Sequence, residues 1–169
     1  SSFYTTRLAF LWSLSLGSVV FVPVSLISVF ITHINIKFFV TLCSELMINI
    51  INNNKPVVAK IHGAAFAAGC QLVASCDLAL STNDAIFATP GVNIGLFCST
   101  PMVAVSRNVS RKKIMKMLLT GDSISAQYAK EIGLINDHFE NSKLEDEVLK
   151  LAETIASKSS KVLKIGKQA

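Results

Sequence analysis

The chain has 169 residues and a formal net charge of +5; 51% of its residues are hydrophobic and 16% are charged. This length suits one domain with a substantial core, and the basic residues lack the stacking aromatics that would favour nucleic-acid binding. The four cysteines form no C-x-x-C pair and the three histidines lie far apart. The sequence therefore predicts reduced core thiols, no disulfide framework and no metal site.

Residues 1–37 differ from the rest of the chain. Leu8–Ile31 carries no Lys, Arg, Asp or Glu and is long enough for a membrane helix. Pro23, five serines and many β-branched residues weaken that interpretation. A secretory signal disagrees with the unpaired cysteines, and a mitochondrial transit peptide would be rich in arginine. Two interpretations stay open: a membrane helix or anchor, and an N-terminus that is divergent or not native to this fold.

Residues 38–169 have the pattern of an α/β protein. Apolar residues recur at helical spacing over Phe38–Ile51, and three asparagines end that helix. The strand Val57–Ile61 follows and leads through His62 and Gly63 into a helix predicted over Ala67–Cys76. This helix is almost free of polar residues, so we expect it to be enclosed. Its first N–H groups have no partner within the helix and can bind an anion or a polarised carbonyl.

The remaining elements are short and well punctuated. We expect strands at 78–80 and 85–88, then a loop over 92–98 and a helix from Ser99 with Pro101 at its first position. Two further helices are predicted over 111–120 and 126–132, followed by an extended segment at 134–139. A capping box at Ser142–Glu145 opens the next helix, and a last helix starts at Ser159 or Ser160. Strands alternating with helices favour a parallel sheet. Basic residues gather at 107–116 and 158–167. They are compatible with a phosphorylated ligand, but the solvated faces of ordinary helices are the favoured interpretation.

Three segments, in order, carry a resemblance to the enoyl-CoA hydratase/isomerase (crotonase) superfamily: A-K-I-H-G-A-A-F-A-A-G-C-Q-L-V-A-S-C-D at 59–77, F-A-T-P-G-V-N-I-G-L at 87–96 and L-L-T-G-D-S-I-S-A-Q-Y-A-K-E-I-G-L-I-N at 118–136. The resemblance implies an α/β spiral of ββα turns that binds acyl thioesters of coenzyme A, with no separate cofactor. It divides the chain into the apolar segment 1–37 and a partial domain 38–169, whose N-terminal part is missing or divergent and whose C-terminal helices are truncated.

The resemblance also implies the site. The family holds the thioester oxygen with two main-chain N–H groups, and the second of these falls on Ala68, between Ala67 and Gly69. The first comes from an earlier loop that residues 1–37 do not match. The two glutamates that act as general acid and base in family hydratases fall on Gln71 and Gly91. Because an amide and a hydrogen atom cannot do this work, we expect hydratase activity to be weak, altered or absent.

Several interpretations remain open at this point. Gln71 either orients a water or ligand carbonyl or is hydrogen-bonded within the helix packing. His62, Cys98 and Ser99 are candidate substitute proton carriers, with packing or capping as the other interpretation. The resemblance implies fatty acid metabolism, a mitochondrial location and a trimer-type homo-oligomer, and the alternative is a non-catalytic acyl-CoA- or partner-binding protein, possibly membrane-tethered through 8–31. For residues 1–169 alone we expect poor coenzyme A affinity and poor solubility.

Overall fold

The structure, a computed structural model, describes residues 20–23 and 36–169. A four-stranded sheet in these residues has the order β1-β2-β4-β7, and all three pairings are parallel. Its strands are β1 (Val20–Pro23), β2 (Val57–Ile61), β4 (Leu78–Thr82) and β7 (Asp137–Phe139). A second sheet pairs β3 (Ala64–Phe66) in parallel with β5 (Ile86–Ala88), which pairs antiparallel with β6 (Ile124–Ser125).

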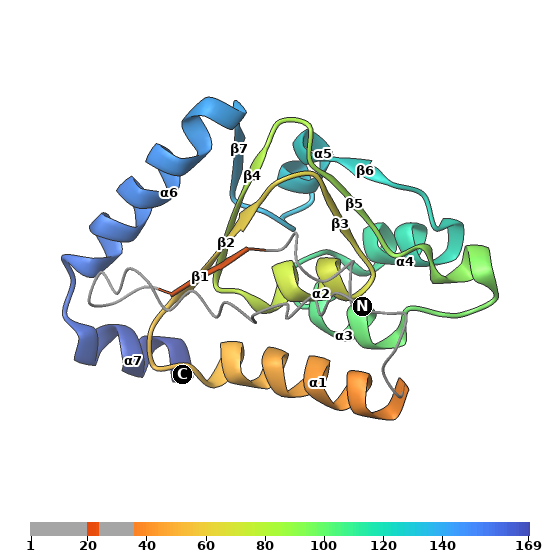
Figure 1. The fold of residues 1–169 in the computed structure, drawn as a ribbon, viewed down its shortest axis with the longest axis horizontal. Coiled ribbons are helices and arrows are strands. Elements are labelled where there is room, and N and C mark those ends of the chain that lie inside the picture. Colours follow the sequence, from red (N-terminus) through yellow and green to blue (C-terminus); the bar gives the residue numbers. More distant parts are fainter. Residues whose placement is uncertain (1–19, 24–35) are drawn as a thin grey trace, which may run out of the picture.

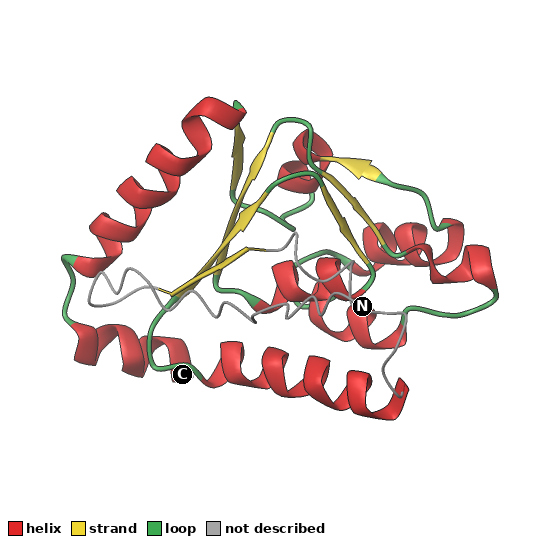
Figure 2. Cartoon of the chain, viewed as in Figure 1, coloured by secondary structure: helices red, strands yellow, loops and turns green. Residues whose placement is uncertain are grey.

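The chain passes twice from the first sheet to the second. After β2 it enters β3 and then a helix, and after β4 it enters β5 and then further helical turns (Figure 1). This repetition matches the expected ββα turns. The described helices (Figure 2) are α1 (Ile36–Asn52), α2 (Ala68–Ser75), the 3₁₀ helix η2 (Pro90–Ile94), α3 (Ser99–Val105), α4 (Arg111–Thr120), α5 (Ala126–Glu131), α6 (Asn141–Ala156) and α7 (Ser160–Gln168).

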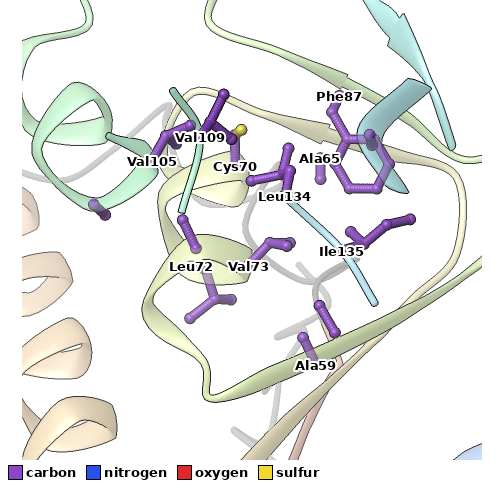
Figure 3. Close-up of a cluster of buried hydrophobic side chains, with 14 of the residues drawn as sticks. Ala59, Ala65, Cys70, Leu72, Val73, Phe87, Val105, Val109, Leu134 and Ile135 are labelled. Carbon is purple, nitrogen blue, oxygen red and sulfur yellow. The ribbon is translucent and has the colours of Figure 1, made fainter. Parts of the chain in front are cut away.

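The core lies on both faces of the first sheet. Because successive strand residues point to opposite faces, Val57, Ala59 and Ile61 pack toward α2, whereas Val58 packs toward α6. The larger cluster surrounds α2 with residues from β5, α3 and the segment before β7, among them Leu72, Val73, Phe87, Val105 and Leu134 (Figure 3). The structure thus confirms that the helix predicted over Ala67–Cys76 is enclosed, since no residue of α2 is exposed.

Most predicted elements are confirmed to within two residues, but four details were wrong. Residues 64–66 form β3, and Pro90–Ile94 form η2 rather than only a loop. Pro101 is the third residue of α3 and not its first. The capping box at Ser142–Glu145 is not formed, because α6 already begins at Asn141 and Glu145 pairs with Lys60 of β2.

The described residues contain no helix long and apolar enough to span a membrane. Within the expected span Leu8–Ile31, the four residues Val20–Pro23 form the strand β1 beside β2, so this part of the span is not helical. The rest of that span lies outside the described residues. The division at residues 37 and 38 stays a prediction.

Candidate functional site

The candidate site begins at an unusual backbone turn between β3 and α2. Ala67 has φ 48° and ψ −111°, and it is the sole non-glycine residue with positive φ in the described ranges. Its N–H donates to the carbonyl of Ala88 at the end of β5, at 2.9 Å. Such a conformation costs of order 1–3 kcal/mol and persists only where the surroundings hold it in place. The β3–β5 pairing supplies that restraint and fixes where α2 starts.

The turn leaves three main-chain donors at the start of α2. Gln71 is the first residue whose N–H bonds back, to the carbonyl of Ala67 at 3.0 Å. The N–H groups of Ala68, Gly69 and Cys70 make no hydrogen bond within the described part of the chain. Gly69 and Cys70 are buried and Ala68 is half-buried. Unpaired donors with restricted access to water can stabilise an oxygen that gains negative charge.

Gln71 lies one turn into α2 and is half-buried. Its backbone is fully used, because its carbonyl also accepts from the hydroxyl of Ser75 at 2.8 Å. Its side-chain amide has no hydrogen bond to any described residue. The interpretation of Gln71 as hydrogen-bonded within the helix packing therefore loses its support. An amide without a partner beside unpaired N–H groups is available to a water or a ligand carbonyl.

Gly91 is buried in η2, and there is little room for a side chain there. A Cβ at this position would lie 2.9 Å from Sγ of Cys98 and 3.0 Å from the carbonyl oxygen of Leu96. The loop is held close by the N–H of Leu96, which donates to the carbonyl of Gly91 at 2.9 Å. The Cys98 thiol thus occupies space that a glutamate at position 91 would have to enter.

The other candidate proton carriers differ in their placement. His62 is exposed between β2 and β3, and it has no described hydrogen-bond partner. Ser99 is exposed as the first residue of α3. Cys98 is half-buried against the core, and its Sγ lies where it would crowd a side chain at position 91.

Sequence reasoning missed the hydroxyl of Thr89, which follows Ala88 at the entrance to η2. It is fully buried and has no hydrogen-bond partner among the described residues. A buried hydroxyl without a partner costs about 1–3 kcal/mol. A threonine in a loop gives no sequence signal of this kind, because its burial depends on tertiary packing.

Three of the four thiols are core residues, as predicted: Cys70 is buried, and Cys76 and Cys98 pack against the core, whereas Cys43 belongs to no core cluster of the described residues. All four cysteines are free. Burial, with a smaller effect of Cys98, raises the pKa of Cys70 to about 12. Burial also raises the pKa of Cys76 to about 12, with Asp77 as a further cause. No cluster of potential metal ligands occurs among the described residues.

Lys167 belongs to the basic segment 158–167 that was considered for phosphate binding, but its ammonium group makes contacts within the fold. Its Nζ lies 2.6 Å from a carboxylate oxygen of Asp77, and it donates to the carbonyl of Ile50 at 2.9 Å. A third bond reaches the carbonyl of Lys55 at 3.2 Å. This lysine therefore joins α7 to the end of α1 and the start of β2.

Known proteins share both the sequence and the fold of this chain. A family model described as enoyl-CoA hydratase/isomerase matches residues 37–169. The mitochondrial enoyl-CoA hydratase domain-containing protein 3 of Danio rerio is 53% identical over 126 residues, which are 75% of this chain and 44% of that protein. The Homo sapiens protein of that name is 50% identical over 125 residues, 74% of this chain and 41% of its own length.

Solved structures give the same result. The crystal structure of the human protein of that name has a TM-score of 0.73 and 49% identity, covering 76% of this chain and 51% of that one. An enoyl-CoA hydratase of Mycobacterium smegmatis has a TM-score of 0.75 and 44% identity, covering 81% and 55%. The chain thus spans less than half the length of the two curated relatives.

Proposed function

Because this chain belongs to the enoyl-CoA hydratase/isomerase family, we propose that it binds acyl thioesters of coenzyme A in fatty acid metabolism and that its hydratase activity is weak, altered or absent. The observation that carries the proposal is the set of unpaired N–H groups at Ala68, Gly69 and Cys70. The N–H of Ala68 serves as the thioester-oxygen donor, with Ala67 and Gly69 shaping the turn around it. Coenzyme A enters as part of the substrate.

The proposed loss of hydration rests on two side chains. A hydratase of this kind needs a group that delivers a proton and a group that activates water, and such steps supply about 10²- to 10⁴-fold in rate. Gln71 carries an amide, which acts neither as a proton donor acid nor as a proton acceptor base near neutral pH. Gly91 has no side chain, and Cys98 fills part of the adjoining space. Binding and polarisation of the thioester remain, whereas the proton transfers have no carboxylate at these two positions.

A direct assay tests this proposal. The chain is mixed with an enoyl-CoA, and loss of the conjugated thioester absorbance is followed, in parallel with Gln71→Glu/Gly91→Glu/Cys98→Ala. The triple variant restores both carboxylates and removes the thiol that crowds position 91, so we expect its turnover to exceed that of the parent by about 100-fold. Cys98→Ala alone is the matched control and should leave turnover low. Turnover by the parent comparable to an ordinary hydratase would refute the proposal.

The same observations support a non-catalytic alternative. In this alternative the chain binds an acyl-CoA or a partner protein without turnover. Calorimetric binding of a saturated acyl-CoA, together with no gain of turnover in the triple variant, would favour it.

Location and assembly are proposals as well. The relatives carry "mitochondrial" in their names, which supports a mitochondrial location for this chain. A trimer-type homo-oligomer is supported by the exposed apolar side chains of Ile94, Leu96 and Val103 around the start of α3. Sedimentation at several protein concentrations would measure the assembly, and a monomer at all of them would contradict this proposal.

A further inference from the structure

A cavity lies between α4, the loop after it, β6 and α5. In Figure 1, α4 lies on the opposite side of the view from α6 and α7. Its volume is about 580 Å³, within the range of small-molecule sites. Its lining combines two cationic side chains, several hydroxyl groups and an apolar floor: Lys113, Lys116, Met117, Thr120, Asp122, Ser123, Ile124, Ser125 and Tyr128.

The charge of α4 is unbalanced. Arg111, Lys112 and Lys113 occupy its first turn, which contains no acidic residue. Positive side chains at this end are disfavoured, because the helix dipole is also positive there. None of the basic side chains of α4 forms an ion pair with a described residue, whereas five other lysines of the chain do. An anion beside Lys113 and Lys116 would relieve this repulsion.

The hydroxyl groups divide into used and available donors. Thr120 donates to the carbonyl of Lys116 at 2.9 Å, and Ser125 accepts the N–H of Tyr128 at 3.2 Å. The hydroxyl groups of Ser123 and Tyr128 make no hydrogen bond with a described residue. Because Ser125 only accepts, its hydroxyl can still donate, so two ammonium groups and the hydroxyl groups of Ser123, Ser125 and Tyr128 remain able to donate to a ligand.

The remaining lining limits what fits. Met117 is buried and Ile124 half-buried, so the floor accepts a small apolar part. Asp122 also lines the cavity, and its carboxylate forms no ion pair with a described residue. This carboxylate repels a highly charged anion placed next to it, and it can accept a hydrogen bond from a hydroxyl or amino group of a ligand.

We propose that this cavity binds a phosphorylated small molecule, with Lys113 and Lys116 holding the phosphate group and Ser123 and Tyr128 donating to it. Asp122 accepts a hydrogen bond from the non-phosphate part. The inference does not depend on the acyl-thioester proposal, because no residue of the Ala67–Gln71 turn lines the cavity. The phosphate can come from coenzyme A itself or from a separate phosphorylated molecule, and the test separates these sources.

The experiment titrates the full chain with inorganic pyrophosphate at low ionic strength, by calorimetry. Lys113→Gln/Lys116→Gln removes two charge-assisted contacts, so we expect at least about tenfold weaker binding. The matched control is Arg111→Gln/Lys112→Gln, which removes the same charge from the same helix without touching the cavity lining, and binding should change less than about threefold. Tyr128→Phe removes a single donor and should weaken binding without altering the fold.

Each outcome decides the matter. Equal weakening in the two double variants would assign binding to the general field of the helix and overturn the proposal, as would absence of pyrophosphate binding by the parent. If selective weakening is found, displacement of pyrophosphate by coenzyme A identifies its phosphates as the source. Failure of coenzyme A to displace it identifies a separate phosphorylated molecule. Because the cavity lies apart from the Ala67–Gln71 turn, the pyrophosphate titration can succeed even if the enoyl-CoA assay shows neither turnover nor thioester binding.

Discussion

Ala67 directly precedes α2, and its backbone has a conformation that glycine adopts more readily than alanine. Its φ of 48° is imposed by β3 pairing and by the bond from its N–H to Ala88. A non-glycine residue there stores of order 1–3 kcal/mol, and glycine would remove this strain while losing roughly 0.5–1 kcal/mol through chain entropy.

We therefore expect Ala67→Gly to raise the free energy of unfolding by about 1 kcal/mol. Ala67→Val should lower it, because a β-branched side chain is poorly tolerated at positive φ. Urea denaturation of the three proteins measures both changes. A lower stability of the glycine variant would show that the turn is not strained.

At this scale the sequence predicted unpaired N–H groups at the start of α2, which the structure contains, but it did not predict their surroundings. Ala68 and Gln71 could be placed because local motif spacing fixes them on one helix. The contact between Gly91 and Cys98 depends on the left-handed Gly95 and the 3₁₀ turn before it. Those features follow from packing of η2 against α4, which residue spacing does not reveal.

The helix α7 is held by polar contacts more than by apolar burial. None of its residues is buried, and Val162 and Ile165 are exposed. Lys167, whose side chain is only 9% exposed, bonds Asp77 and two carbonyl groups, and Gln168 adds a bond to Asn54 at 3.3 Å. Loss of the lysine should therefore release this helix before the rest of the domain unfolds.

For Lys167→Met we expect amide hydrogen exchange in α7 to speed up by about tenfold or more, because hydrogen bonds to a charged group contribute about 1.5–3 kcal/mol. Exchange in β2 and β4 should change little. Lys164→Met, at an exposed position on the same helix, provides the control. Equal acceleration in both variants would mean that the Lys167 contacts do not anchor α7.

Helix positions were easier to predict than the reasons for them. The end of α4 at Gly121 and the Ser125 cap of α5 were read correctly, since a left-handed glycine and a capping hydroxyl act locally. The capping box before α6 was wrong because Glu145 pairs instead with Lys60, which is distant in sequence. Likewise β3 has little local strand propensity and exists through its pairing with β5.

The described residues have the α/β crotonase fold, and this fold buries two ionisable thiols. Cys70 and Cys76 have pKa values raised to about 12, mainly by burial. In the unfolded chain these thiols return to about 8.5. Between these values the folded state keeps protons that the unfolded state releases. The free energy that these protonated thiols contribute is therefore fully present below the pKa of the unfolded chain, and it is lost as pH rises toward the pKa of the folded state.

We expect the free energy of unfolding to fall with pH above about 8.5, by up to roughly 1.4 kcal/mol per pH unit for each thiol. Urea denaturation between pH 8 and 10.5 measures this slope, because most of this interval lies between the thiol pKa of the unfolded chain and that of the folded state. Because lysines and tyrosines titrate there too, the readout is the difference from Cys70→Ala/Cys76→Ala, whose slope should be shallower. Parallel slopes would show that the two thiols are not protected from ionisation.

The unpaired N–H groups after Ala67 have a consequence for the history of such a site. A peptide N–H survives every substitution except proline, whereas a carboxylate disappears with a single codon change. A lineage can therefore lose proton-transfer chemistry at positions such as 71 and 91 while it keeps the receptor for an oxygen atom. The retained main-chain receptor is a stable starting point from which a different neighbouring side chain can be recruited for new chemistry.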